Sequence, residues 1–146
     1  MRLARLSAAE AAAAAGVHRA AFDERLPWLA GLHTPDDDLG YWRDHVFAGC
    51  QVWGAWEDNR LVGVIAYRDG FIEQLYVLPG FQGRGAGGAL LDIARRGQGR
   101  LRLWTFQRNG GARRFYEQRG FVAIELTDGA ANEEREPDVL YEWVAT

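Results

Sequence analysis

The pattern of apolar and polar residues predicts a helical start for the chain after one short strand. Residues Arg2 to Leu6 are the strand candidate. The alanine-rich stretch that follows has the highest intrinsic helix propensity, and Ser7 and Glu10 have the spacing of a capping box. A helix to about Phe22 is therefore predicted, followed by a loop.

From Thr34 onward the periodicity changes twice. Thr34 and Pro35 predict the start of a second helix, which ends near Phe47. Beyond it, most of the chain shows β-rich runs bounded by turn-forming residues, interrupted by two stretches with helical spacing. The predicted strands are Gln51–Glu57, Leu61–Tyr67, Phe71–Val77, Leu101–Phe106, Phe121–Leu126 and Val139–Val144.

The order of these elements predicts the fold class. It is β-α-α-β-β-β-α-β-α-β-β, which favours an α/β (α+β) fold: a mixed, mainly antiparallel sheet of six to seven strands flanked by about four helices. With 146 residues, we expect a single domain over residues 1–146. No apolar run reaches the roughly 18 residues of a membrane helix and no signal peptide is recognisable, so we expect a cytoplasmic protein without a membrane partner.

Composition narrows the possible chemistry. The single cysteine, Cys50, excludes a disulfide framework, and the 3 histidines show no metal-ligand spacing, so no metal is predicted. All 17 basic residues are arginine, which removes Schiff-base lysine chemistry and the phosphate-loop lysine. The net charge of -3, without a basic stripe interleaved with aromatic residues, argues against a nucleic-acid partner.

Charge is segregated along the second half of the chain. From Arg84 to Arg119 there are nine arginines and two acids, and from Glu125 to Glu142 there are seven acids and one arginine. This indicates an anionic ligand beside the first segment and a cationic one beside the second. Solvated helix and loop faces would produce the same pattern, and both readings stay open.

Five of the 18 glycines fall within residues 80–88, between a predicted strand and a predicted helix. The first turn of a helix has unpaired N–H groups, and glycines let a phosphate approach them closely. Gly83, Gly85 and Gly88 match the dinucleotide fingerprint, but no acidic residue closes the following strand and too little chain remains for a doubly wound sheet. We therefore predict a phosphorylated cofactor of another kind.

Two motifs carry a family resemblance. Gln82-Gly83-Arg84-Gly85-Ala86-Gly87 resembles the Q/R-x-x-G-x-G/A signature of the GCN5-related N-acetyltransferase (GNAT) family. A second signature of that family is N-x-x-A-x-x-F-Y-x-x-x-G-F. The chain resembles it further on, in the correct order and spacing, at Asn109, Ala112, Phe115-Tyr116 and Gly120-Phe121. In element order the resemblance covers nearly the whole chain, most strongly from about residue 50 to 125.

The resemblance implies an acetyl-CoA-dependent N-acetyltransferase that moves the acetyl group directly from the thioester to a primary amine of a small molecule. Backbone N–H groups of the glycine cluster would hold the pyrophosphate, and the strand before it would hydrogen-bond the pantetheine. The cofactor-binding residues that it implies are Leu75, Tyr76, Val77, Gln82, Gly83, Arg84, Gly85, Ala86, Gly87, Gly88, Asn109 and Ala112.

Two residues are catalytic candidates. By the resemblance, Tyr116 lies near the cofactor sulfur and protonates the departing thiolate. Glu73 shares a strand face with Phe71, Leu75 and Val77, and an acid among apolar residues suits a general base.

The acceptor site is expected between the loop after the first helix and the loop between the last strands, as in the family. The candidates are Trp28, His33, Asp128, Asn132 and Glu133, and the acidity of the second loop indicates a cationic amine. A protein or peptide N-acetyltransferase and a non-catalytic acyl-CoA-binding module are alternative interpretations. A monomer and a homodimer are both compatible with the sequence.

Overall fold

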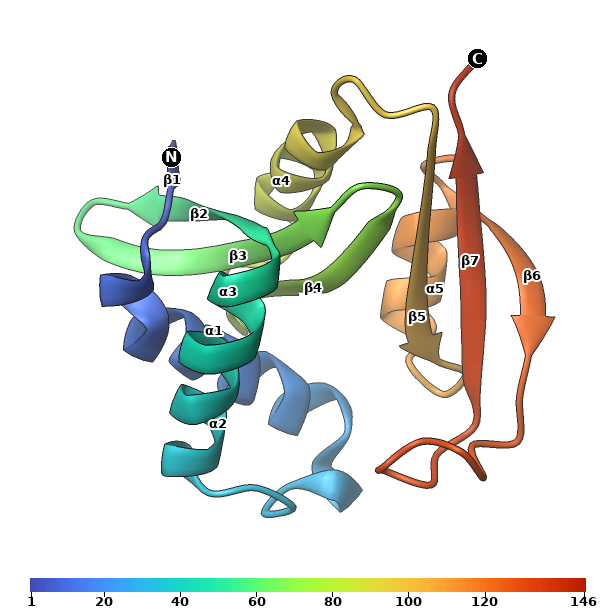
Figure 1. Cartoon of the computed structure of the whole chain (residues 1–146), viewed down its shortest axis with the longest axis horizontal. Helices are drawn as coiled ribbons and strands as arrows, with labels where there is room; N and C mark the ends of the chain where they lie inside the picture. The colour runs from blue at the N-terminus through green and yellow to red at the C-terminus, as the bar shows by residue number, and fades with distance from the viewer. The chain divides into compact units, whose positions relative to one another are not determined.

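Seven strands form the sheet of the computed structural model, which describes residues 1–146 (Figure 1). Their order is β1-β2-β3-β4-β5-β7-β6, and only β4 and β5 pair in parallel among the strands whose register is defined. This confirms the predicted mixed, mainly antiparallel α/β fold. The strands are β1 (Arg2–Arg5), β2 (Gln51–Glu57), β3 (Arg60–Arg68), β4 (Phe71–Val77), β5 (Arg100–Phe106), β6 (Val122–Leu126) and β7 (Asp138–Val144).

The helical stretch from Pro35 to Gly49 changes its hydrogen-bond pattern along its length. Two short 3-10 turns, η1 and η2, flank α1, and a π-helical turn, η3, joins α2 to α3. The bounds are η1 (Ala8–Glu10), α1 (Ala11–Arg25), η2 (Pro27–Leu29), α2 (Pro35–Tyr41), η3 (Trp42–Val46), α3 (Phe47–Gly49), α4 (Ala86–Arg95) and α5 (Gly110–Glu117).

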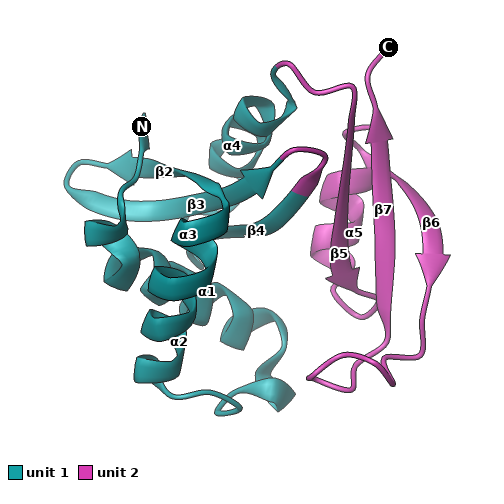
Figure 2. Ribbon diagram, viewed as in Figure 1, with its two compact units in different colours: residues 1–68, 72–96 teal, residues 69–71, 97–146 magenta.

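The chain divides into two compact units (Figure 2). The first comprises residues 1–68 and 72–96, which hold β1, β2, β3, nearly all of β4, and α1 to α4. The second comprises residues 69–71 and 97–146, which hold β5, β6, β7 and α5. The two family-like motifs therefore belong to different units.

In the first unit, β3 is the centre of the core. Every residue from Leu61 to Tyr67 is buried, and both α1 and α4 pack against the strand. A strand covered by helices loses the apolar-polar alternation of a half-exposed strand. At Gly63, a β-carbon would come within 3.2 Å of the Leu90 side chain, so the absence of one lets α4 approach β3 closely.

In the second unit, β7 lies between β5 and β6 and is antiparallel to both. The residues of β5 and β7 that face the core are fully buried. Tyr116 of α5 and Phe121, in the turn after this helix, are buried with them. This core consists of Leu101, Leu103, Val139, Tyr141, Tyr116 and Phe121.

The helix boundaries differ from those predicted in two places. The first helix continues to Arg25 and stops before Pro27, which cannot donate a backbone hydrogen bond. The second helix was expected to end near Phe47; it widens into a π-helical turn from Trp42 to Val46 and ends at Gly49. The predicted caps are present: Ser7 N donates to the Glu10 carboxylate at 2.5 Å, and Asp37 N donates to Thr34 Oγ1 at 3.1 Å.

Candidate functional site

The glycine-rich segment between β4 and α4 is an open turn whose backbone only glycine adopts readily. Gly80, Gly83 and Gly85 have φ angles of 87°, 78° and 92°. A β-carbon at any of the three would meet no heavy atom within 4 Å. The glycines are therefore needed for their backbone conformation, and the space above them is open to a ligand.

This turn leads into α4, whose N-terminus has no side-chain cap. Gly85 is the N-cap of α4, and no side chain accepts a hydrogen bond from the first turn of this helix. The first N–H groups of a helix lack intrahelical partners and carry the positive end of the helix dipole. Open space, glycine backbone and unpaired amides together fit a phosphate group.

Polar and cationic side chains hold the turn and surround it. Gln82 Nε2 donates to the carbonyl oxygen of Val77 at 3.0 Å, and Gln82 Oε1 accepts from the Arg25 guanidinium of α1. The guanidinium carbons of Arg60 and Arg84 lie 5.4 and 5.2 Å from the centre of the Phe81 ring. Two cations thus lie beside the turn, where they would attract an anionic ligand.

The side chains of β4 contact different partners in the first unit. Gln74 Nε2 donates to the Tyr41 hydroxyl of α2 at 2.9 Å, and the Tyr76 ring stacks on His18 of α1. Glu73, the proposed base, accepts from Arg68 Nε at 2.8 Å and is 32% exposed. This cationic partner was not predicted from the strand alternation, which indicated only apolar neighbours.

In the second unit, the second motif forms and positions α5. Asn109 is the N-cap, and its Oδ1 accepts from the backbone N–H of Ala112 at 3.1 Å. Tyr116 is buried against the rings of Phe115, Phe121 and Tyr141, with centroids 5.1, 5.4 and 6.2 Å away. Burial raises the pKa of Tyr116 well above its ordinary value, because the phenolate would be poorly solvated.

A hydrogen-bonded group that sequence reasoning missed ties α5 to β7. The Tyr141 hydroxyl donates to Glu117 Oε2 at 2.5 Å and accepts from Arg113 Nε at 2.9 Å. Tyr141 itself is fully buried in the core of this unit. The contacts fix the helix that carries Tyr116 to the central strand of its unit.

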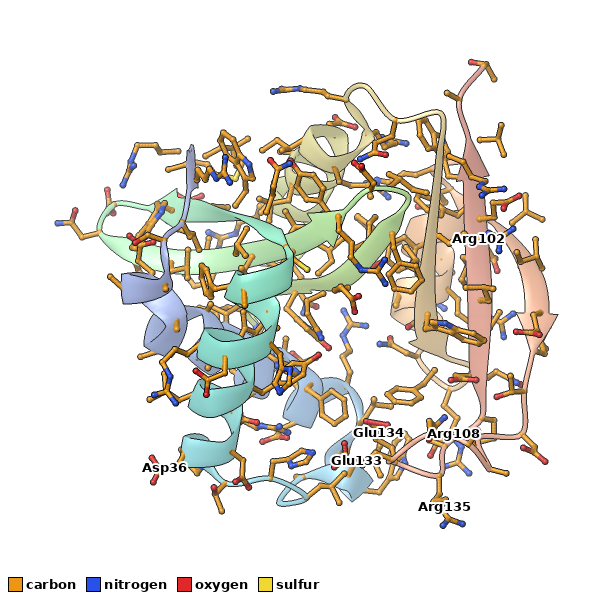
Figure 3. All side chains as sticks on the ribbon, viewed as in Figure 1. Asp36, Arg102, Arg108, Glu133, Glu134 and Arg135 are labelled. Carbon is orange, nitrogen blue, oxygen red and sulfur yellow. The ribbon has the colours of Figure 1, made fainter.

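The loop between β6 and β7 is built by its own side chains. Asn132 Nδ2 donates to the carbonyl oxygen of Glu136 at 2.8 Å, and Asn132 Oδ1 accepts from Glu136 N at 3.2 Å. Asp128 Oδ1 accepts from Ala130 N at 2.9 Å. Two acceptor-site candidates, Asp128 and Asn132, thus hold the loop itself, while the third, Glu133, projects from it with Glu134 and Arg135 (Figure 3).

Tight packing fixes one turn of this loop. Gly129 has a φ angle of 81°, and a β-carbon there would lie 2.4 Å from the carbonyl carbon of Glu136. No other residue fits without moving the backbone. The backbone of this loop is therefore fixed, and both interpretations of its acidic side chains, a site for a cationic amine and a solvated face, stay open.

The other two acceptor-site candidates lie on the segment between α1 and α2. Trp28 belongs to η2 and is 50% exposed. His33 directly precedes Thr34, the N-cap of α2. Their substrate-binding role stays a prediction.

A family model decides the class of this chain. Residues 48–123 match the model of the acetyltransferase (GNAT) domain. The chain belongs to the GNAT acetyltransferase family. The predicted family resemblance is thereby confirmed, and the matched residues of this GNAT chain include the glycine turn, Asn109 and Tyr116.

Known proteins agree with the assignment. Peptidyl-lysine N-acetyltransferase YiaC of Escherichia coli (strain K12) is 31% identical over 93 residues, which span 58% of this chain and 64% of YiaC. Less than two thirds of that relative is thus covered. Among solved structures, apo YjaB from Escherichia coli matches with a TM-score of 0.80 at 17% identity, over 100% of both chains. PaiA N-acetyltransferase from Thermoplasma acidophilum, in complex with coenzyme A, matches with a TM-score of 0.72 at 19% identity, over 99% and 98% of the two chains.

One residue of the first unit, His18, was not among the predicted site residues. His18 of α1 contacts β4 and η3 through its ring, and the sequence around it is an ordinary helical stretch. Its partners are distant in sequence, so no local signal could have identified it.

As for membranes, none of the helices combines the length and the apolar character that a transmembrane span requires.

Proposed function

We propose that this GNAT acetyltransferase binds acetyl-CoA and transfers the acetyl group directly to the primary amine of a small, cationic acceptor. The observation that carries the proposal is the glycine turn, which opens space above the uncapped N-terminus of α4 directly after β4. A structural relative in complex with coenzyme A, PaiA, supports the choice of donor.

The proposed donor site combines main-chain and side-chain groups. In the first unit, backbone N–H groups from Gln82 to Gly88 would hold the pyrophosphate, and the main chain of Leu75 to Val77 would hydrogen-bond the pantetheine as an added strand does. The guanidinium groups of Arg60 and Arg84 beside the turn would balance phosphate charge. Asn109 and Ala112 of the second family motif stay cofactor-binding residues by the family resemblance alone.

Acetyl-CoA supplies an acetyl group already activated as a thioester. The ammonium group of the acceptor first loses one proton to a base. Its nitrogen then forms the new bond to the acetyl carbon, the carbon–sulfur bond breaks, and the nitrogen loses a second proton while the departing thiolate takes one from water. A lysine-like amine has a pKa near 10.4, so at neutral pH a base must take its proton. We assign this role to Glu73, whose partly exposed carboxylate can accept the proton directly or through a water molecule.

Tyr116 acts on the leaving sulfur in this proposal. Because its pKa is raised, the phenol stays protonated throughout the working pH range. Complete transfer of that proton to a thiolate of pKa near 8.5 would be uphill. The group therefore stabilises the developing thiolate mainly by donating a hydrogen bond, which is a smaller role than the full protonation implied by the family resemblance.

A second candidate acceptor is the lysine side chain of a peptide. The observation that favours it is the 31% identity to peptidyl-lysine N-acetyltransferase YiaC. A cationic acceptor is favoured by the acidic loop between β6 and β7, on which Glu133 and Glu134 lie (Figure 3).

Thiol release with acetyl-CoA tests both candidates. The panel comprises polyamines, aminoglycosides, amino acids and lysine-containing peptides, and each product is checked by mass spectrometry for the added acetyl group. The proposal predicts amine-dependent thiol release with at least one class. Binding of coenzyme A without acetylation of any amine would instead indicate a non-catalytic acyl-CoA-binding module.

A further inference from the structure

His18 lies in an aromatic enclosure in the first unit. Its ring stacks on Tyr76 of β4, with centroids 4.4 Å apart and planes inclined by 19°. The rings of Phe22 and Trp42 meet it edge-on, each with a centroid 5.9 Å away. Contacts from α1, η3 and β4 therefore fix the orientation of the imidazole.

A hydrogen bond from Trp42 fixes the tautomer. Trp42 Nε1 donates to His18 Nδ1 at 2.9 Å. An indole can only donate, so Nδ1 carries no proton and the single ring proton of the neutral imidazole is on Nε2. A second proton would have to enter at Nδ1, against the indole N–H.

The surroundings keep the ring neutral. Burial is the largest cause that lowers the pKa of His18, to about 4, and the adjacent Arg19 and the more distant His33 lower it further. Asp38 and Asp23 act in the opposite direction, but both are hydrogen-bonded to Arg19, at 2.8 and 3.0 Å. The imidazole is therefore uncharged at neutral pH.

Nε2 is the ring nitrogen left to bind a ligand. The Trp42 indole occupies Nδ1, and His18 keeps part of its surface accessible to solvent. An Nε2–H group can bond only to a lone pair. An amine about to react must keep its own lone pair for the attack, so the partner that suits this donor is an oxygen.

The position of the ring separates this oxygen from the donor substrate. Hydrogen-bonding groups of a strand lie in the plane of the sheet, whereas side chains stand out of it. His18 covers the Tyr76 side chain, so Nε2 lies off the sheet, on the side of β4 that α1 covers. The pantetheine proposed to pair with the main chain of β4 lies in the plane instead.

We propose that His18 is an acceptor-binding residue, whose Nε2–H donates to a carbonyl or carboxylate oxygen of the amine substrate. Trp42 is then a positioning residue that acts through His18 by fixing its tautomer. This inference rests on the proposed acetyltransferase function and names one chemical group that the acceptor must carry.

Three amines distinguish the sources of that oxygen. Nα-acetyl-lysine methylamide offers amide carbonyls, lysine offers a carboxylate, and pentylamine offers no oxygen. The His18→Asn variant keeps an oxygen for the Trp42 indole but loses the Nε2–H, whereas His18→Gln restores an N–H donor near the same place.

The His18→Asn variant should raise the KM of the oxygen-bearing amine about ten-fold, as expected for one hydrogen bond to substrate. The KM of pentylamine and that of acetyl-CoA should stay unchanged, and His18→Gln should recover part of the loss. Equal KM increases for all three amines, an altered KM for acetyl-CoA, or no change at all would overturn the inference. If the native chain acetylates no amine, the proposed function fails and the inference fails with it.

Trp42→Phe provides an independent readout. Without the indole donor, Nδ1 can carry the ring proton, so part of the His18 population loses its Nε2–H group. Burial still keeps the imidazole uncharged. The KM of the oxygen-bearing amine should therefore rise by about two-fold or more at pH 7, while the KM of pentylamine and that of acetyl-CoA stay unchanged. An unchanged KM for the oxygen-bearing amine would contradict the role given to Trp42.

Discussion

Replacing Gly85 by glutamate tests the anion site at its best-defined point. Gly85 is the N-cap of α4, with a φ angle of 92° and no heavy atom within 4 Å of where a β-carbon would stand. A glutamate there places a carboxylate beside the helix N–H groups that are proposed to hold phosphate. The substitution therefore changes the ligand site without creating a clash in the core.

The Gly85→Glu substitution should weaken the binding of coenzyme A more than it lowers the stability of the fold. The left-handed backbone costs a non-glycine residue about 1 kcal/mol, so the free energy of unfolding falls by roughly that amount. Losing one hydrogen bond to a charged group costs about 1.5 to 3 kcal/mol of binding free energy, and charge repulsion adds to it. The Kd of coenzyme A should rise by roughly 100-fold, since about 1.4 kcal/mol corresponds to a factor of ten.

Gly97→Glu is the matched control. Gly97 lies just past the C-terminal end of α4, has a φ angle of 72°, and likewise has no heavy atom within 4 Å of a β-carbon position. The Gly97→Glu substitution adds the same charge and a similar backbone strain at the other end of α4. Calorimetric titration with coenzyme A, together with thermal unfolding, should show a weakened Kd for Gly85→Glu alone. A native Kd in Gly85→Glu, or the same weakening in both variants, would show that the N-terminus of α4 does not bind the phosphates of coenzyme A.

Three further predictions follow from single contacts. Tyr116→Phe should lower kcat about ten-fold and leave the KM of acetyl-CoA unchanged, because it removes a hydrogen bond that forms only as the thiolate develops; an unchanged kcat removes Tyr116 from the mechanism. Glu73→Gln should lower kcat by about 100-fold. Arg68→Gln, which removes the ion-pair partner of Glu73, should leave kcat within about two-fold. Similar kcat values for the two variants would show that Glu73 is not the base. Asp38 is buried against Arg19, which lowers the pKa of that carboxyl, so its stabilisation is present above the unfolded-state pKa near 3.9 and is lost as pH falls through the lower folded value. Asp38→Asn should cost about 2 kcal/mol at pH 7 and weaken the loss of stability in acid, and chemical unfolding at pH 7 and pH 3 that gives equal differences from the native chain would contradict this.

The strands were largely predictable, because their signals are local. The bounds of β2 and β4 agree with the sequence prediction, since β-branched and aromatic runs are interrupted by turn residues such as Asp58 and Gly70. The glycine turn was recognisable for the same reason: positive φ angles at closely spaced positions require glycine.

The features that were missed depend on distant partners. The π-helical turn that begins at Trp42 has no signal in its own residues, and the indole of Trp42 bonds to His18 on another helix. The Arg68 partner of Glu73 depends on the hairpin that joins β3 to β4. Likewise, the order in the loop after β6 comes from Asn132 contacting Glu136, and composition alone indicated only an acidic segment.

The most direct test of the central claim follows thiol and acetylated amine in one sample. Acetyl-CoA is incubated with a lysine peptide or a polyamine and either the native chain or Gly85→Glu. Equal amounts of free thiol and acetylated amine are expected with the native chain, and the rate of both should be strongly reduced in Gly85→Glu at limiting acetyl-CoA. Coenzyme A binding without any acetylated amine, or acetylation that persists unchanged in Gly85→Glu, would contradict the proposed function.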